Sequence, residues 1–274
     1  MAIVNNLPPN MPRHTCPHCG SRRSWEVRRQ SRKCAACRRE WSTRKNPVAG
    51  IRADEKAWRA FLFAALRYRT VGAIRLHFPA SRPTLLAMCL AMRNAMAADV
   101  PATLSGVVEV DETYVSGTWH NKPWSVRRLG TKRGRGTSKQ PVFGILERGR
   151  GVVRAFLVPD AKKSTIMPII LATVEAGSTI YSDGYRLYRE TPKHGYRHAY
   201  VDHAQHEYGR GEVHSNGMEG FWGYLKRGLK TTGGIRRDRL GLFVSEEVWR
   251  YNRRKDSEKE KIERLLDFLG KFGG

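Results

Sequence analysis

Acidic side chains are scarce in this sequence. The 274 residues contain 25 Asp and Glu against 50 Lys and Arg, which gives a formal net charge of +25 at pH 7. Charge of one sign repels itself in a compact fold, so this excess favours a polyanionic partner over a protein that is basic for solubility alone. We expect nucleic acid. An anionic membrane surface is the weaker alternative, because no basic amphipathic helix stands out.

Long apolar runs are also absent. No stretch approaches the roughly 18 apolar residues that a membrane helix needs, and the N-terminus lacks the charged-then-apolar order of a secretory signal. We therefore expect a cytoplasmic protein with no membrane partner. The hydrophobic share of 40% is nevertheless that of a globular chain with a buried core.

Cysteine is rare, and its few residues are unevenly placed. The chain has five, in a sequence without an export signal, so disulfides are not expected. Cys16 and Cys19 form one CxxC pair and Cys34 and Cys37 form another, with fourteen residues between the pairs. Two such turns present four thiolates to one ion, so the spacing predicts a structural Zn²⁺ site in a zinc ribbon rather than a redox pair.

Two segments concentrate the positive charge. Residues 1–50 hold eleven Lys and Arg with two acidic residues, interleaved with the cysteine pairs, so we expect the zinc ribbon to contact DNA phosphates. Residues 116–139 hold seven Lys and Arg and no acidic residue. The loop from Trp119 to Lys139 is either a DNA clamp or a solvated loop.

Changes in hydrophobic pattern divide the chain into three parts. Residues 1–47 contain the cysteine pairs and end at Asn46-Pro47. Residues 48–100 are rich in Ala, Leu and Met at helical spacing, which predicts a helix-turn-helix-like segment in which Ser81 is an N-cap. Residues 101–274 read as strands, a helix, a strand and then helices, which predicts a mixed α/β domain.

Two aspartates follow the predicted strands of this domain. Asp111 lies in the apolar run VVEVDETYV, with Glu109 on the same strand face and Glu112 on the opposite one. Asp183 follows a second strand-like run, STIYSDG. Taken singly, Asp111 has an ordinary explanation as an edge residue and Asp183 as part of an Asp-Gly turn.

A predicted helix starting at Asn216 carries three further polar candidates. Asn216, Glu219 and Lys226 share one face, away from the buried stripe of Met218 and Trp222. A capping box explains the first two equally well, and a solvated charge explains Lys226. Two aspartates on separate strands and a glutamate on a later helix can, however, converge and hold two Mg²⁺ or Mn²⁺ ions for phosphoryl transfer.

The order of these motifs resembles a known family. VEVDETYV, YSDGYRLY, VHSN, EGFW, LKRG and RYNRR together are similar to the DDE transposases of bacterial insertion sequences, in the branch with an N-terminal zinc ribbon and a ribonuclease H-like catalytic domain. Thirty-five residues separate Asp183 from Glu219, a spacing familiar in that family. The resemblance covers nearly the whole chain, from about Cys16 to Arg254.

The resemblance implies metal ligation by Asp111 and Asp183, with Glu219 as the third ligand. Some members use Asn instead, so Asn216 is the alternative; we favour Glu219 because a carboxylate binds Mg²⁺ better than an amide does. Lys226 would hold a DNA phosphate beside the scissile bond. The implied partners are double-stranded DNA, as terminal repeats and target, and at least one further copy of the chain in a nucleoid-associated complex.

Two other functions stay open at this point. A DNA-binding regulator would need the cysteines and the basic surface but none of the three carboxylates. A stand-alone ribonuclease H-like nuclease would use the same chemistry without joining DNA ends. His203 and His214 lie between the second and third candidate ligands in sequence, where a surface role is favoured over a place near the metals.

Overall fold

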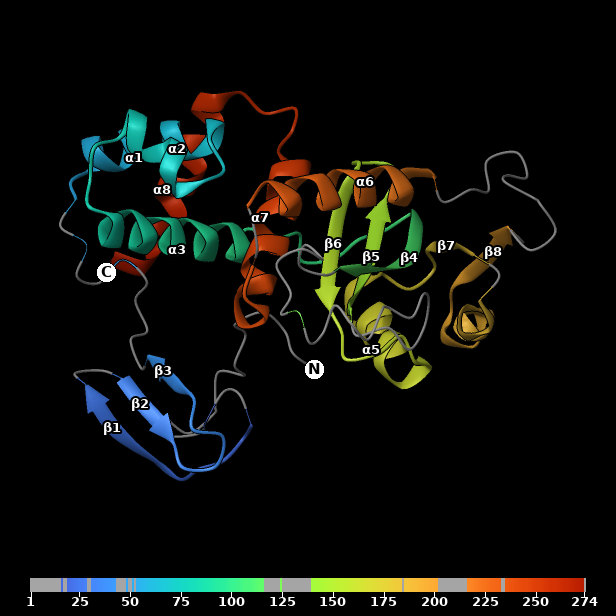
Figure 1. Cartoon of the computed structure of the whole chain (residues 1–274). Helices are drawn as coiled ribbons and strands as arrows, with labels where there is room; N and C mark the ends of the chain where they lie inside the picture. Colours follow the sequence, from blue (N-terminus) through green and yellow to red (C-terminus); the bar gives the residue numbers. More distant parts are fainter. Residues whose placement is uncertain are drawn as a thin grey trace.

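The structure is a computed structural model. It describes residues 16, 19–28, 31–42, 48, 51, 53–115, 124, 139–183, 185–201, 216–232 and 235–273. The loop from Trp119 to Lys139, apart from Trp124 and Lys139 themselves, lies outside the described residues, as do His203 and His214. Figure 1 shows a small sheet, a group of helices and a larger sheet with helices on both faces.

The small sheet contains the cysteine segment. Its strands β1 (Ser24–Arg28), β2 (Ser31–Cys34) and β3 (Glu40–Ser42) are antiparallel neighbours in that order. The segment between the two cysteine pairs thus forms two paired antiparallel strands. Cys34 ends β2, so the second CxxC turn connects β2 to β3.

Three helices follow, each beginning at a capping side chain. They are α1 (Glu55–Arg67), α2 (Val71–His77) and α3 (Arg82–Ala98), and Asp54, Thr70 and Ser81 accept hydrogen bonds from their first turns. These caps satisfy backbone donors that the helix itself leaves open. The predicted N-cap at Ser81 is confirmed.

The C-terminal helix α8 (Glu258–Gly273) packs against these three helices rather than against the large sheet. Its Leu265 and Leu269 share one buried core with Phe61 of α1 and Leu85 of α3. The chain therefore returns to the helical segment at its C-terminal end. The division into 1–47, 48–100 and 101–274 stays a prediction.

The large sheet has five strands in the order β6-β5-β4-β7-β8. They are β4 (Val107–Val115), β5 (Gln140–Glu147), β6 (Val152–Leu157), β7 (Thr179–Asp183) and β8 (Arg197–Val201). β4 pairs antiparallel with β5 and parallel with β7, so the sheet is mixed. The expected mixed α/β fold, a mixed sheet flanked by helices, is confirmed.

Helices cover both faces of this sheet (Figure 1). On one face, α5 (Lys163–Thr173) and the 3-10 helix η2 (Arg186–His194) pack with Val108 and Val110 of β4. On the other, α6 (Asn216–Thr231) and α7 (Leu240–Asn252), joined through the 3-10 helix η4 (Arg237–Arg239), pack with β5 and β6. Strand alternation places Asp111 on the α6 face. None of the described helices is long and apolar enough to cross a bilayer.

Candidate functional site

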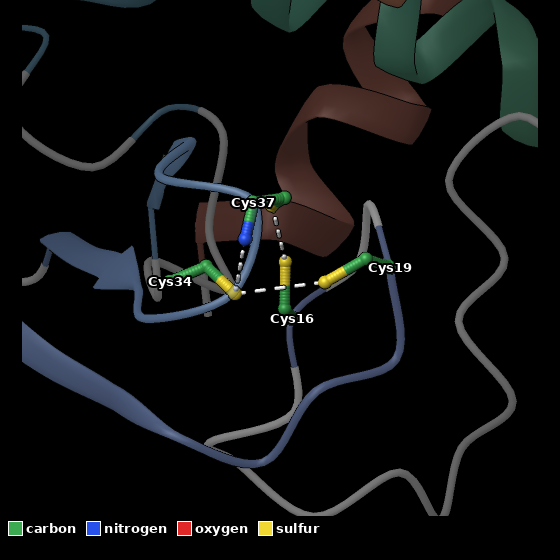
Figure 2. A group of neighbouring side chains, drawn as sticks. All are labelled: Cys16, Cys19, Cys34 and Cys37. Carbon is green, nitrogen blue, oxygen red and sulfur yellow. Dashed lines mark hydrogen bonds between the residues drawn. The ribbon is translucent and has the colours of Figure 1, made fainter.

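The four paired cysteines come together in one cluster (Figure 2). The Sγ atoms of Cys16 and Cys37 are 3.6 Å apart, those of Cys19 and Cys34 are 3.5 Å apart, and all four lie within 4.8 Å of one another. Tetrahedral zinc with Zn–S bonds of about 2.3 Å places its sulfurs at roughly 3.8 Å. The cluster therefore fits one Zn²⁺ ion, as the spacing predicts.

Backbone geometry in the second turn favours a thiolate. The N–H of Cys37 points at the Sγ of Cys34 at 3.5 Å, and hydrogen bonds from the backbone of this turn hold the pKa of Cys34 at about 6, below its usual value. Arg38 follows with a left-handed backbone, φ 57°, which closes the turn. Ionised sulfur is the form that binds zinc.

Zinc removal is expected to unfold this module alone. Structural zinc contributes on the order of 10 kcal/mol to the folding of such small units, whereas the large sheet and its helices have cores of their own. A chelator at neutral pH, or Cys34→Ser, should therefore abolish NMR amide dispersion of residues 16–42 and keep that of residues 139–183. Cys89→Ser, at the cysteine outside the cluster, is the control for metal content. Retained ribbon signals after zinc loss would contradict the assignment.

Asp111 and Asp183 lie on neighbouring parallel strands at matching height. Glu109 of β4 pairs with Tyr181 of β7, and each aspartate follows its partner residue by two positions. Residues two apart on a strand share a face, so both carboxylates belong to the same side of the sheet as Glu109. Asp111 and Asp183 are both partly buried.

Trp222 of α6 fixes the Asp111 side chain. Its indole Nε1 donates a hydrogen bond of 2.8 Å to Oδ2, while the backbone N–H of Glu112 donates to Oδ1 at 2.8 Å. Gly144, which pairs with Asp111 across β4 and β5, makes this approach possible, because a Cβ there would lie 2.5 Å from the Trp222 ring. The sequence predicts Trp222 as a buried core residue. No feature of the neighbouring sequence indicates that its indole also donates a hydrogen bond to Asp111.

Glu109 ties the start of α6 to the strand that carries Asp111. This side chain is 2% exposed; Oε1 accepts from Arg148 Nε at 2.7 Å and Oε2 accepts from the backbone N–H of Met218 at 2.9 Å. A negative carboxylate at a helix N-terminus is favourable, since unpaired N–H groups and the helix dipole meet it there. Gly217 permits the contact, because a Cβ would lie 2.9 Å from Oε2.

The helix start differs from the capping box considered above. Asn216 is itself the first residue of α6, and the N–H of Met218 is bound by Glu109 from another strand. Glu219 and Asn216 are both exposed in the first turn, three positions apart on one face. Lys226, seven residues beyond Glu219, is exposed on that same side of the helix. The ligand role of Asn216 or Glu219 and the phosphate role of Lys226 stay predictions.

Electrostatics couple the three candidate carboxylates. The pKa of Asp111 is raised to about 6, mainly by burial and also by the negative charges of Asp183 and Glu219, while the hydrogen bonds from Trp222 and from the backbone of Glu112 lower it. Among the described residues, the cysteines are the group whose ligand atoms all lie within 4.8 Å, so the carboxylates are spread more widely.

The opposite face of β4 has its own buried acidic contact. The hydroxyl of Tyr188, in η2, donates to Oε1 of Glu112 at 2.5 Å. Burial, then the charge of Glu112, raises the pKa of Tyr188 well above its usual value, so the phenol remains a donor. Glu112 is thereby held by η2 on the face of β4 opposite Asp111, as its strand parity predicts.

Comparison with known proteins shows which family this chain belongs to. A family model described as the ISXO2-like transposase domain matches residues 103–252, which contain the whole large sheet and helices α5 to α7. The chain belongs to this transposase family. The match includes Asp111, Asp183 and Glu219 together with their supporting strand and helix.

Two curated relatives agree with this membership. The chain is 32% identical over 184 residues to an uncharacterized protein in transposable element ISH50 of Halobacterium salinarum, over 64% of this chain and 62% of that protein. It is 30% identical over 100 residues to an uncharacterized transposase-like protein of Haemophilus influenzae, over 36% of this chain and 80% of that one. The chain thus spans less than two thirds of the archaeal relative.

A solved structure is also similar at low level. It is that of the simian T-cell lymphotropic virus intasome in complex with PP2A regulatory subunit B56 gamma. The identity is 14% and the TM-score 0.35, over 70% of this chain and 67% of that one.

Proposed function

We propose that this transposase-family chain cuts phosphodiester bonds at the ends of an insertion sequence and joins the 3′ ends to target DNA. The observation that supports this most is the position of Asp111 and Asp183, level on adjacent parallel strands and electrostatically coupled to Glu219 on α6. In this proposal the three side chains hold two Mg²⁺ or Mn²⁺ ions. The bound ions would stabilise charge on the reacting phosphoryl oxygens.

The chain's own residues would prepare this site before DNA binds. Trp222 fixes one Asp111 oxygen and leaves the carboxylate a lone pair for a metal. Glu219 is exposed on α6 and would complete the ligand set, with Asn216 as the alternative oxygen donor. Lys226, two turns further on, would hold a phosphate beside the scissile bond.

Double-stranded DNA is the proposed partner, both as terminal repeats and as target. The net charge of +25 and the zinc-ribbon candidate, with Arg22, Arg23 and Arg39 exposed, support this choice. Two ends must be cut together, so we propose at least a dimer in the DNA complex. We also propose that the protein is located in the bacterial cytoplasm, associated with the nucleoid.

Strand transfer by wild type and Asp183→Ala tests the function. Each protein is incubated with Mg²⁺, plasmid DNA and linear DNA carrying the element's ends, and the products are separated on denaturing gels. We expect joined products from wild type and at least a ~10³-fold loss in Asp183→Ala, since the metal site loses a ligand. Asp267→Ala, at an exposed carboxylate on α8, is the matched control and should retain wild-type activity.

The products distinguish the alternatives. Cleavage without joining would replace the transposase by a ribonuclease H-like nuclease. Equal DNA binding by wild type and Asp183→Ala, with neither cutting nor joining under Mg²⁺ or Mn²⁺, would leave a DNA-binding regulator.

A further inference from the structure

A cavity of about 270 Å³ lies where the helical segment meets the transposase domain. Its wall combines the end of α1 with α6, α7 and α8, through Leu66, Arg69, Tyr224, Arg250, Arg254 and Lys261. These elements are far apart in the sequence, and Figure 1 shows α7 between the helical group and the sheet. Four of the eight lining residues are cations and one, Glu258, is a carboxylate, so the wall is basic.

Two of these cations already have carboxylate partners. Arg69 pairs with buried Glu247 of α7, and Arg250 pairs with Glu246 at 2.9 Å while donating to the last carbonyls of α1. The one carboxylate in the wall, Glu258, is held by a bidentate pair with Arg67, at 2.9 and 3.0 Å. The charges of these groups are therefore balanced within the protein.

Arg254 and Lys261 are held differently. Arg254 donates to the carbonyls of Gly151 and Tyr251 at 2.9 and 2.8 Å and stacks 4.1 Å from the Tyr251 ring centre. Lys261 donates to the carbonyl of Asp256 at 2.7 Å. Carbonyls fix both groups in place without cancelling their charge, and within the described part of the chain neither forms an ion pair. The cavity thus keeps two positive charges in a fixed arrangement.

We propose that this cavity binds one phosphate group of the DNA backbone, with Arg254 and Lys261 as the charged donors. Fixed cations of this kind lose little conformational entropy when they bind an anion, and a charge-assisted hydrogen bond to phosphate is the strong type. The inference rests on the proposed function for the choice of DNA. A phosphate here would contact α8 and the segment that follows α7, next to Tyr224 of α6, and would so link the helical segment to the transposase domain.

A salt series of duplex DNA affinity tests the cavity without any chemistry. The full chain is measured with its zinc bound and without Mg²⁺, as wild type, as Arg254→Gln/Lys261→Gln and as Lys255→Gln/Lys259→Gln. The last pair removes the same charge from exposed positions on neighbouring turns. We expect a ~10- to 100-fold weaker affinity for the cavity variant, with a salt slope smaller by about one. The matched control should lose less than about threefold.

The design separates this proposal from failure of the catalytic one, because binding is scored even if no strand is ever transferred. Equal losses in the two double variants would overturn the proposal, since net charge alone would then explain them. If Arg254→Gln impairs folding, Lys261→Gln alone carries the test, and wild-type affinity in that folded variant overturns it.

Inorganic phosphate serves as the second probe. At constant total ionic strength, phosphate should compete weakly with DNA at the cavity, raising the DNA Kd of wild type and leaving that of the cavity variant unchanged. Phosphate that binds wild type tightly by calorimetry, with no difference in DNA affinity between the variants, would instead assign the cavity to a free phosphate compound and overturn the DNA assignment.

Discussion

Asp111→Asn is expected to abolish strand transfer and, at the same time, to stabilise the protein at neutral pH. The amide keeps an oxygen that can accept the Trp222 hydrogen bond, so the helix α6 should stay in place. The negative charge that would bind metal is removed, and we expect a loss of at least ~10³-fold in the rate of joining. Strand-transfer rates with Mg²⁺ and with Mn²⁺ measure this half of the prediction.

The stabilising half follows from the raised pKa of Asp111. Its pKa in the folded chain is about 6, against about 3.9 in an unfolded chain, because burial and two neighbouring carboxylates oppose ionisation. The folded state binds the proton more tightly, so stability is greatest below pH ~4 and declines as pH rises through 6. Two pKa units correspond to about 3 kcal/mol, which the metal-free wild type forgoes at pH 7. Asp111→Asn recovers part of it, because its NH₂ group replaces one of the two oxygens that accept from Trp222 and from the backbone of Glu112.

Denaturant unfolding at pH 5, 6 and 7.5, without Mg²⁺, measures this effect through signals of the large sheet. The wild type should lose stability between pH 5 and 7.5 by more than Asp111→Asn does. Asp267→Asn, on the exposed side of α8, should follow the wild-type profile. If the stabilities of wild type and Asp111→Asn changed with pH in parallel, the pKa of Asp111 would not be raised in the folded protein.

Much of the fold could be predicted because its signals are local. Apolar, strand-like runs mark β4 to β7, the capping residue Ser81 marks the start of α3, and the CxxC spacing predicts that the two cysteine turns meet. Asp111 and Asp183 could also be predicted as candidates from the sequence, because each follows an apolar run that is expected to form a strand of the sheet. In these cases a few residues that are neighbours in the sequence determine the local structure.

Contacts between distant segments could not be predicted in the same way. The amphipathic pattern of α8 shows that it has a buried face, but it does not say that Leu265 packs on Phe61, some two hundred residues earlier. By sequence, Glu109 looks like a second carboxylate on the same strand face as Asp111. Its partners are Arg148, in the turn after β5, and the backbone of Met218 in α6. Gly217, adjacent to Asn216, was the available signal, because a glycine in a first helical turn indicates a close approach.

Glu109→Gln is the second change from which we expect a large effect. The carboxylate is shared by Arg148 and the N–H of Met218, and both contacts are buried or partly buried. A glutamine can accept from one donor but presents its own NH₂ to the other. Breaking a buried ion pair on one side costs ~3 kcal/mol or more, so we expect a loss of that order in the free energy of unfolding.

Glu109→Gln should also slow strand transfer, because Glu109 connects the strand of Asp111 to the helix of Glu219. A displacement of the first turn of α6 by about 1 Å would cost on the order of 10²-fold in strand transfer. Mn²⁺ affinity, measured by EPR, should weaken in parallel, which a purely global loss of stability would not produce well below the unfolding temperature.

Two variants make the interpretation specific. Glu55→Gln removes an exposed partner of Arg59, a pair that solvent screens, and should leave joining and Mn²⁺ affinity unchanged. Adding Arg148→Gln to Glu109→Gln lets two amides hydrogen-bond and should restore part of the stability, which a double-mutant cycle measures. Wild-type Mn²⁺ affinity in folded Glu109→Gln would limit Glu109 to holding the fold. Weakened affinity that partly recovers in the double variant would mean that the buried pair sets the distance between the strand and helix carboxylates.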